Sequence, residues 1–408
     1  MAIRLKRLLK IAVPLSLCCG TVAPAFAALP ELPLNGVFTG KQGKNHLQGI
    51  AVDERNGWIY YSFTTRLVKG DLQGNILGSV EGLVGHLGCI AFCPEDGCVY
   101  GSLEFKKDSI GADILHSLGD GREYEDGFYV AVFDTAQITR MGMSAEADGV
   151  MTAAFLPEVL DDYAGKGENG RDHRCGCSGI DGLCFAPKPG DPDGPKKLWV
   201  AYGVYSDLLR SDNDHQVLLC YDRETLRACA APLRQTDMHR QGPDAPEKKY
   251  FAFTGNTTYG VQNLEYDPVH RLLLMAVYRG HKPQYANFDM FAADLTKPAR
   301  AVPLKGLGET GAALTLWGAD APESDDVAGW RDAGGQCGMH VMNDGSLLVA
   351  ETVTVDGENA AYIKPYTFDP ETGLQPKAAA ANTRLTVWQR ILRWIRAIVA
   401  AVKGWFGA

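Results

Sequence analysis

The sequence lacks the motifs that would assign a common enzyme chemistry at once. It contains no phosphate-binding glycine loop and no G-x-S-x-G motif, which argues against nucleotide hydrolysis and against α/β-hydrolase chemistry. It has no uninterrupted apolar run of about 20 residues, the length that a membrane-spanning helix needs. No long disordered tract is present either, and the apolar fraction is that of a globular protein. We therefore expect one large folded domain or two ordinary ones.

Basic residues are scarce in the body of the chain. The sequence has 40 Lys and Arg against 49 Asp and Glu, and nine of the basic residues lie in residues 1 to 27 and 383 to 408. Because phosphate binding needs a basic surface, we do not expect nucleic acid as a partner. The acidic body favours neutral, cationic or metal-bridged ligands.

Residues 1 to 27 have the order of a cleavable export signal. Four basic residues between Arg4 and Lys10 precede an apolar run from Ile11 through Cys19, and the small-residue tripeptide Ala25-Phe26-Ala27 follows. These features are typical of a Sec-type signal peptide and predict cleavage after Ala27. We therefore expect the domain of residues 28 to 376 to be exported, either to the periplasm or to the extracellular space.

The other end of the chain predicts a basic amphipathic helix over residues 383 to 408. From Trp388 onward, large apolar side chains fall on one face at helical spacing and basic side chains fall on the other. Such a helix suits a membrane surface with anionic headgroups, or it docks on the acidic surface of its own domain. Residues 377 to 382 are predicted to be the linker that precedes it.

Nine cysteines follow the predicted cleavage site. Cys93 and Cys98 bracket a Pro-Glu-Asp-Gly turn, and Cys220 and Cys229 bracket a second turn region, so each pair could face its partner across a hairpin. An oxidising compartment allows disulfides to persist. We expect disulfides or buried thiols rather than a zinc site, because zinc modules usually show two separated cysteine pairs.

Five segments of the body repeat one pattern. Each segment has a short apolar strand, a turn rich in Asp, Asn, Pro or Gly, and a second strand of Val, Leu, Tyr or Trp. The segments are residues 46 to 63, 86 to 103, 179 to 202, 260 to 278 and 338 to 351. Repeated antiparallel units of this kind predict an all-β fold, a β-propeller of five blades with six as the alternative, rather than a pair of β-sandwiches.

Further strands are expected after these units, and one of them indicates how the ring closes. Val37-Phe38-Thr39-Gly40 precedes the first repeat much as residues 251 to 255 precede the fourth, so we expect the N-terminal strand to complete the last blade. The other strands are expected at residues 128 to 133, 216 to 221, 290 to 294 and 363 to 368.

Over residues 36 to 370, this blade pattern resembles the secreted β-propellers of bacteria. That superfamily includes lactonase-like and NHL-like proteins and the five-bladed glycosidases. Because the resemblance rests on the blade pattern alone, it implies a fold and no particular activity.

Polar residues recur where the inner strands begin, and in a propeller these positions converge on the central channel. A buried strand gains nothing from such side chains unless they are paired or solvated, since each unpaired one costs about 1 to 3 kcal/mol. The candidate ligand-binding residues are His46, Gln48, His86, His173, Asp181, Gln262 and Asn263, with Tyr202 and Tyr278 at the far ends of second strands. The candidate catalytic residues are Glu104, Glu351 and His340.

Three functions fit this set. A carboxylic acid, Glu104 or Glu351, acts with a histidine as general acid and base on a glycoside, ester or lactone. Alternatively, histidines and carboxylates hold a divalent metal ion. In the third function the same groups bind a glycan or a partner without catalysis. We expect an exported propeller that binds a small molecule or glycan and hydrolyses it; the alternative is a recognition or scaffold protein on the cell surface.

Overall fold

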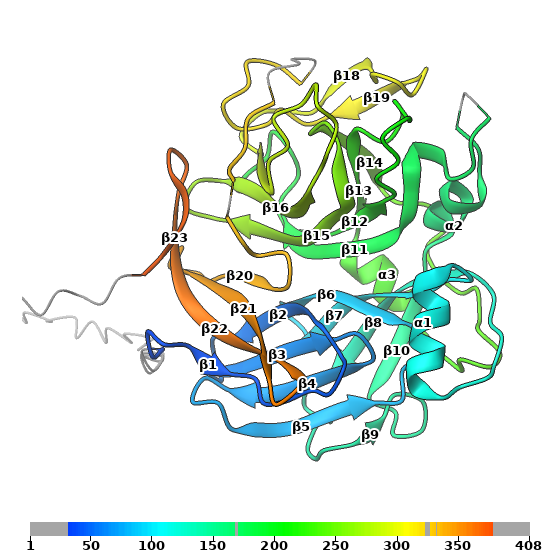
Figure 1. Ribbon diagram of the computed structural model, residues 1–408, viewed down its shortest axis with the longest axis vertical. Helices are drawn as coiled ribbons and strands as arrows, with labels where there is room; N and C mark the ends of the chain where they lie inside the picture. Colours follow the sequence, from blue (N-terminus) through cyan, green and yellow to red (C-terminus); the bar gives the residue numbers. More distant parts are fainter. Residues whose placement is uncertain (1–31, 168–169, 323–326, 332, 378–408) are drawn as a thin grey trace, which may run out of the picture.

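The strands form five separate sheets arranged around a common centre, as Figure 1 shows. The structure is a computed structural model that describes residues 32–167, 170–322, 327–331 and 333–377. The predicted signal peptide of residues 1 to 27 and the predicted helix of residues 383 to 408 lie outside the described residues, as does the predicted linker beyond Lys377. No helix in the described ranges is long and apolar enough to cross a membrane.

Each sheet is one blade, and the first strand of each repeat is its innermost strand. Blade 1 contains β2 (Leu47–Asp53), β3 (Trp58–Phe63), β4 (Arg66–Asp71), β5 (Ile76–Glu81) and β9 (Met143–Ser144), which is parallel to β5. Blade 2 contains β6 (His86–Cys93), β7 (Cys98–Phe105), β8 (Gly127–Asp134) and β10 (Met151–Phe155).

Blades 3 and 4 follow the same plan with different outer strands. Blade 3 contains β11 (Cys177–Ala186), β12 (Lys197–Val204), β13 (His215–Tyr221), β14 (Lys248–Phe253), β19 (Thr310–Ala313) and β18 (Arg300–Pro303). Blade 4 contains β15 (Thr257–Asp267), β16 (Leu272–Arg279) and β17 (Met290–Asp294).

Blade 5 joins the two ends of the domain. It contains β20 (Met339–Val341), β21 (Leu347–Val355), β22 (Glu358–Asp369) and β23 (Gly373–Pro376). Strand β1 (Val37–Phe38) pairs with β22 in this same sheet, so the N-terminal strand completes the last blade as the sequence predicts. In Figure 1 the orange strands of blade 5 accordingly lie beside the blue strands of blade 1.

The inner strands close a ring. In the order β2, β6, β11, β15 and β20, each strand contacts the next, and β20 contacts β2. The predicted five-bladed propeller is therefore confirmed, and the five sequence repeats are the two inner strands of the five blades.

Alternation along the strands builds the hydrophobic core. In β2, Ala51 packs with residues of blade 2, whereas its neighbours Ile50 and Val52 pack with residues of blade 5. Successive side chains of a strand point to opposite faces, so each blade contributes one set of side chains to each neighbour. The described residues form five hydrophobic clusters, one at each interface between adjacent blades.

Three short helices lie in loops: α1 (Ser109–Leu118), α2 (Pro157–Ala164) and α3 (Arg223–Cys229), with a 3-10 turn at Arg174–Gly176. Helix α1 begins where Asp108 accepts a hydrogen bond from the Gly111 N–H, and it ends at Gly119, whose φ of 64° is the left-handed conformation that favours glycine. Because α1 follows the end of β7, it lies at the end of the channel where the inner strands begin.

The nine cysteines of the described residues are free thiols, and seven of them are buried. Cys93 and Cys98 do face each other across the β6–β7 hairpin, as predicted. The prediction that Cys220 faces Cys229 across a hairpin is wrong. The side chain of Asp222 caps helix α3 by accepting from Thr225 N–H, so Cys229 ends a helix instead of a strand.

Because the interfaces between blades are separate cores, we predict that truncations in different interfaces act independently. Leu67 packs between blades 1 and 2 and Leu274 packs between blades 4 and 5, and both are fully buried. L67A and L274A should each lower the free energy of unfolding by about 2 to 5 kcal/mol. The double variant should lose the sum within about 0.5 kcal/mol. Chemical denaturation checks this, and strong non-additivity would contradict independent interfaces.

Candidate functional site

The channel has two chemically different ends. We call the end where the inner strands begin the start mouth, and the end where they finish the far mouth. The start mouth contains a cavity of about 220 Å³, and the far mouth contains one of about 390 Å³. The structure brings seven of the predicted site residues together at the start mouth: His46, Gln48, His86, Glu104, Asp181, Gln262 and Tyr278.

Bulges in the inner strands turn several of these side chains toward the channel. Near their starts, β2 and β6 each contain one more residue than the partner strand, and β11 and β15 each contain more than one extra residue. The bulges lie at or beside Gln48, Gly88, Asp181 and Gln262. A bulge breaks the two-residue alternation and re-aims a side chain. Polar residues of the sequence thereby reach the start mouth while their strands keep apolar faces toward the neighbouring blades.

Neighbouring side chains satisfy the carbonyl groups that the bulges expose. Ser62 of blade 1 donates to the Gly88 carbonyl at 2.6 Å, and Ser102 of blade 2 donates to the Asp181 carbonyl at 2.7 Å. The predicted ligand-binding residue Asn263 has a similar role, because its amide donates to the Gln48 carbonyl at 2.8 Å. Asn263 therefore links blade 4 to blade 1 and does not line the cavity.

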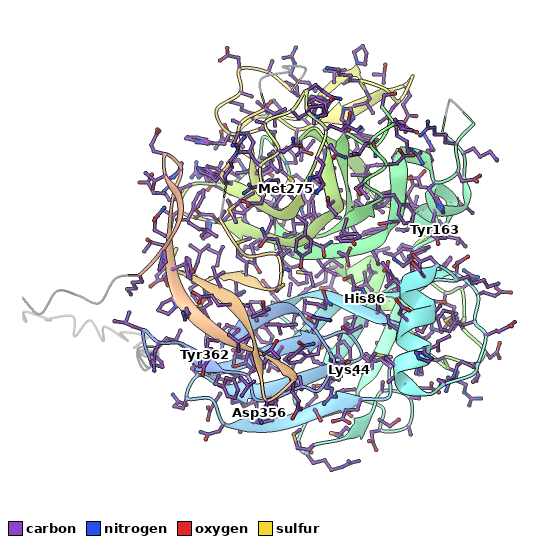
Figure 2. The ribbon with its side chains drawn as sticks, in the orientation of Figure 1. Lys44, His86, Tyr163, Met275, Asp356 and Tyr362 are labelled. Carbon is purple, nitrogen blue, oxygen red and sulfur yellow. The ribbon has the colours of Figure 1, made fainter. Side chains whose placement is uncertain are left out.

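Three side chains form a tight cluster at the start mouth: His86, Glu104 and Asp181. His86 begins β6 and Glu104 lies opposite it on β7, while Asp181 comes from β11 of blade 3. The Nδ1 atom of His86 lies 3.7 Å from Glu104 Oε1 and 3.7 Å from Asp181 Oδ1. One nitrogen or oxygen atom from each side chain lies within 4.8 Å of the other two. His86 itself lies near the centre of the molecule (Figure 2).

The facing atoms of the cluster are not hydrogen-bonded to each other. A separation of 3.7 Å is too long for a hydrogen bond, and His86 Nδ1 is buried without any hydrogen-bond partner. The outer oxygen atoms accept hydrogen bonds: Glu104 Oε2 from the Ile180 N–H at 2.9 Å, and Asp181 Oδ2 from Gln262 Nε2 at 3.0 Å. The facing Oε1 atom of Glu104 also accepts from Lys106 Nζ at 2.6 Å. The arrangement therefore fixes the two carboxylates and leaves one atom of each facing His86.

Burial sets the charge state of the cluster. It lowers the pKa of the His86 imidazole to about 3, so His86 is neutral near pH 7. It raises the pKa of the Asp181 carboxyl well above its ordinary value, and the neighbouring Glu104 raises it further. Burial also raises the pKa of Glu104, although Lys106 opposes this effect. Two carboxyl groups this close resist full ionisation unless a cation compensates them.

Lys106 supplies one such cation, and the sequence analysis missed it. Its Nζ donates to Glu104 Oε1 at 2.6 Å and to the Ser178 carbonyl at 2.8 Å, and its side chain is only 4% exposed. Burial lowers the pKa of Lys106, but Glu104 and Asp108 together hold it above its ordinary value. The spacing from Glu104 could have identified Lys106 in the sequence, because residues two apart on an extended chain point to the same side of it.

An apolar and aromatic rim completes the start mouth. Ile110 of helix α1, Tyr259 and Tyr278 line the cavity together with Cys337. The Tyr259 and Tyr278 rings meet edge to face at 6.0 Å, and Tyr278 Oη lies 3.4 Å from Cys337 Sγ. Tyr259 is half exposed and has a φ of 64°, a strained conformation for a residue with a side chain. The fold thus maintains an exposed aromatic ring beside the cluster.

Two predicted catalytic residues lie elsewhere. His340 lines the cavity of the far mouth, because β20 has only three residues and begins further along the channel than the other inner strands. Glu351 is on blade 5, where Lys364 donates to it at 2.5 Å and Tyr366 at 2.9 Å. Burial alone would raise its pKa, but these two donors hold the pKa of Glu351 below its ordinary value. Neither residue joins Glu104.

Two predicted ligand-binding residues belong to the packing between elements. Tyr202 is fully buried, and its hydroxyl donates to Asp162 of helix α2 at 2.8 Å. His173 packs against the rings of Tyr163 and Tyr205, with Nδ1 2.7 Å from the Tyr163 carbonyl oxygen. Both side chains therefore point away from the start mouth cavity, which neither of them lines.

Comparisons with known proteins do not assign a function to this chain. No protein-family model and no curated protein matches the chain. Among solved structures, the chain is similar to the Dos1 propeller, with 10% sequence identity and a TM-score of 0.30. That match covers 83% of this chain and 60% of the other, less than two thirds of its length. Apart from the fold, the resemblance to secreted bacterial propellers stays a prediction.

The ion pair of Glu104 and Lys106 yields a double-mutant prediction. K106M should lower the free energy of unfolding by about 3 to 5 kcal/mol, because it leaves a buried carboxylate without its cation. The double variant E104Q/K106M removes both charges and should be at least about 1 kcal/mol more stable than K106M.

Denaturant titration of the two variants makes this measurement, with K107M, a change in the adjacent exposed lysine, as the control. K107M should stay within about 0.5 kcal/mol of the unchanged protein. Equal destabilisation by K106M and K107M would contradict a buried ion pair at this position.

Proposed function

We propose that the start mouth binds a divalent metal ion through His86 Nδ1, Glu104 Oε1 and Asp181 Oδ1, and that the site hydrolyses a small ester or lactone. The observation that carries the proposal is the buried, unpartnered Nδ1 atom that faces one oxygen of each carboxylate. A buried polar atom without a partner costs free energy, so its presence calls for a ligand that completes it.

The spacing of the three atoms supports a shared ion. Nitrogen and oxygen ligands held about 2.1 Å from one ion lie about 3.0 to 3.5 Å apart. The two separations from His86 Nδ1 are 3.7 Å, so small side-chain rotations bring all three atoms within coordination distance. One imidazole and two carboxylates suit zinc, manganese, iron or cobalt better than calcium.

The surrounding contacts support the same assignment. Metal-binding carboxylates are usually oriented by hydrogen bonds to their other oxygens. Ile180 N–H and the Gln262 amide hold Glu104 and Asp181 in this way. The neutral form of His86 is the form that coordinates metals.

Charge balance favours an oxygen-rich substrate. Two carboxylates and Lys106 leave one negative charge, and a divalent ion changes this to one positive charge. A bound divalent ion polarises a carbonyl group and activates water. Lys106 holds Glu104 in place, and His46 and Gln48 offer polar groups to the polar part of a substrate. The rim of Ile110, Tyr259 and Tyr278 suits an apolar substituent.

Glycoside hydrolysis is supported less well. Facing oxygen atoms of Glu104 and Asp181 lie within 4.8 Å of each other. This is shorter than the separation of about 5 to 5.5 Å in retaining glycosidases and well below the separation of about 6.5 to 9.5 Å in inverting ones. Glu351, the other carboxylic acid in the prediction, is bound to Lys364 and Tyr366 and lies outside the cavity. We therefore favour acyl substrates over glycosides.

The metal proposal predicts tight binding of Co²⁺ and Zn²⁺ to the metal-free protein. H86Q and D181N should each weaken binding more than about 100-fold, since loss of even an orienting contact costs about 10 to 100-fold. H116Q is the matched control, because His116 is exposed on helix α1. Equilibrium dialysis and the visible absorption of Co²⁺ make the measurement. Unchanged binding by H86Q would refute the site.

Hydrolysis is a separate outcome. Turnover of p-nitrophenyl acetate and of small lactones should depend on the metal and should disappear with a chelator. H86Q should abolish the turnover and H116Q should leave it unchanged. Metal binding without turnover would favour the alternative function, a metal-dependent recognition protein.

We also propose that the protein is exported and that its C-terminal segment binds membrane surfaces. The sequence pattern of residues 1 to 27 supports export, and the segregated basic and apolar residues of 383 to 408 support membrane binding. The full chain should sediment with anionic vesicles in low salt, and a chain ending at residue 382 should not. Equal sedimentation of both would contradict the membrane proposal.

A further inference from the structure

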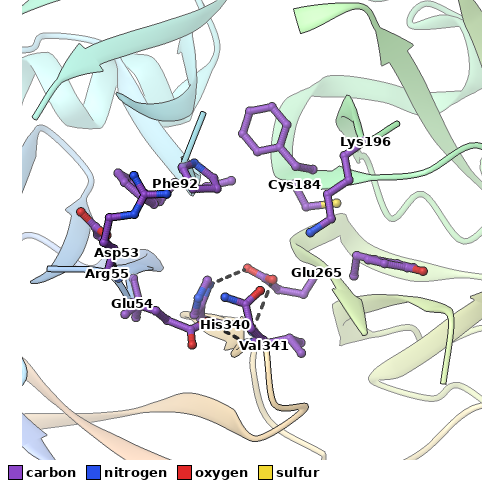
Figure 3. A pocket seen from close by; sticks show the side chains of 15 residues that line it. Asp53, Glu54, Arg55, Phe92, Cys184, Lys196, Glu265, His340 and Val341 are labelled. Carbon is purple, nitrogen blue, oxygen red and sulfur yellow. Dashed lines mark hydrogen bonds and ion pairs between the residues drawn. The ribbon is translucent and has the colours of Figure 1, made fainter. Parts of the chain in front are cut away.

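The far mouth contains a second cavity, larger than that of the start mouth and built from different chemistry (Figure 3). Its volume is about 390 Å³, within the range of small-molecule sites. Residues from the far ends of all five inner strands line it, so it is a property of the closed ring.

A carboxylate and a histidine form the floor of this cavity. Glu265 of β15 is 8% exposed, and its Oε1 atom lies 3.4 Å from His340 Nδ1 of β20. The Val341 N–H donates to the other carboxylate oxygen at 3.4 Å. His340 Nδ1 is buried and has no hydrogen-bond partner. The floor thus holds a negative charge with capacity for further donors.

Aromatic rings form the walls. Phe92, Phe185 and Tyr266 line the cavity, and the first two are only partly buried. Phe92 is stacked on Tyr60 at 5.9 Å, and Phe185 meets Tyr100 edge to face at 5.2 Å. Because rings behind them hold these two side chains, the walls present fixed apolar surfaces to the cavity.

Two cations from different blades complete the opening. Arg55 comes from the β2–β3 turn and Lys196 from the loop before β12, and Figure 3 shows them entering the cavity from opposite sides. Both are exposed, and neither has a carboxylate within ion-pair distance in the described part of the chain. Lys196 Nζ lies 5.8 Å from the centre of the Tyr266 ring.

The other two acidic residues that line the cavity already accept hydrogen bonds from other residues of the chain. Asp53 accepts from the backbone of Arg55 at 3.0 Å and from the side chain of Asn56 at 2.6 Å, which closes its own turn. Glu54 accepts from the Asn343 N–H at 2.7 Å. The charges that face the cavity without such a role are therefore Arg55 and Lys196 at the opening and Glu265 at the floor.

We propose that the far mouth binds a small zwitterion with an aromatic or apolar body, such as an aromatic amino acid or a short peptide. Glu265, with His340 beside it, would accept hydrogen bonds from the ammonium group. Lys196 and Arg55 would bind the carboxylate, and Phe92 and Phe185 would contact the body of the ligand. Charge-assisted hydrogen bonds at two ends give selectivity for a ligand that carries both charges. This proposal does not depend on the metal site of the start mouth.

The test compares three related probes by calorimetric titration of the full protein. L-phenylalanine has both charges, L-phenylalaninamide lacks the carboxylate, and 3-phenylpropionate lacks the ammonium group. L-phenylalanine should bind with a Kd below about 1 mM, and each of the other two should bind at least about tenfold more weakly.

Variants assign the two ends of the ligand. E265Q should weaken L-phenylalanine and the amide about tenfold and leave 3-phenylpropionate unchanged. K196M, a change in an exposed residue, should weaken L-phenylalanine and 3-phenylpropionate and leave the amide unchanged. K188M is the matched control, because Lys188 lies in the same loop, pairs with Glu247 and does not line the cavity.

The outcomes are distinguishable from those at the start mouth. H86Q should leave the binding of all three probes unchanged. Three results would each overturn the proposal: equal affinities for the three probes, no binding of L-phenylalanine at about 10 mM, or equal effects of K196M and K188M. Since K196M changes a surface side chain, this comparison holds even where E265Q alters folding.

Discussion

Mutual coverage of the blades is the constraint on which this molecule depends. The inner strands carry apolar side chains on both of their sides, and these side chains are buried only where a neighbouring blade lies against them. A single blade would expose both faces to water, and an open row of five would still expose two. The contact of β20 with β2 and the pairing of β1 with β22 remove those last two faces. The channel is a by-product of that closure.

The closed ring also explains how the inner strands can carry polar residues at the channel. Near its starting end, four inner strands gain extra residues through bulges, and the carbonyl groups freed there accept hydrogen bonds from donors on adjacent blades, such as Ser62 and Ser102. The two carboxylates of the cluster come from different blades, so their separation is set by how those blades pack. Packing at the interface between blades 2 and 3 therefore positions the chemistry of the start mouth.

The blades could be predicted from the sequence because the same two-strand pattern occurs five times. The residues of the start mouth could be predicted wherever an inner strand begins at the same height along the channel as the others. His86, Asp181 and Gln262 follow that rule. His340 does not, because a loop containing Gly334, Gly335 and Gly338, all with positive φ, replaces the start of the fifth inner strand.

The other residues that the sequence analysis misplaced or did not identify also have local structural explanations. Tyr202 points into the interface between blades because strand alternation turns it away from the channel, and an acidic residue of helix α2 satisfies its hydroxyl. Lys106 lies just beyond the repeat, so a comparison of repeats could not find it. Bulges are tertiary features without a fixed residue signature, and the approach of His86 to two carboxylates depends on them.

The pairing of β1 and β23 with one strand, β22, has a mechanical consequence. Both ends of the described domain leave from blade 5, so a load applied through them would pass across that blade and leave the other four unstressed. The pairing of Val37 and Phe38 with β22 would bear this load first, before the backbone hydrogen bonds that Thr39, Gln42 and Gly43 make with the same strand. Any tether attached to the ends of the described domain thus acts on one of the contacts that hold the propeller closed.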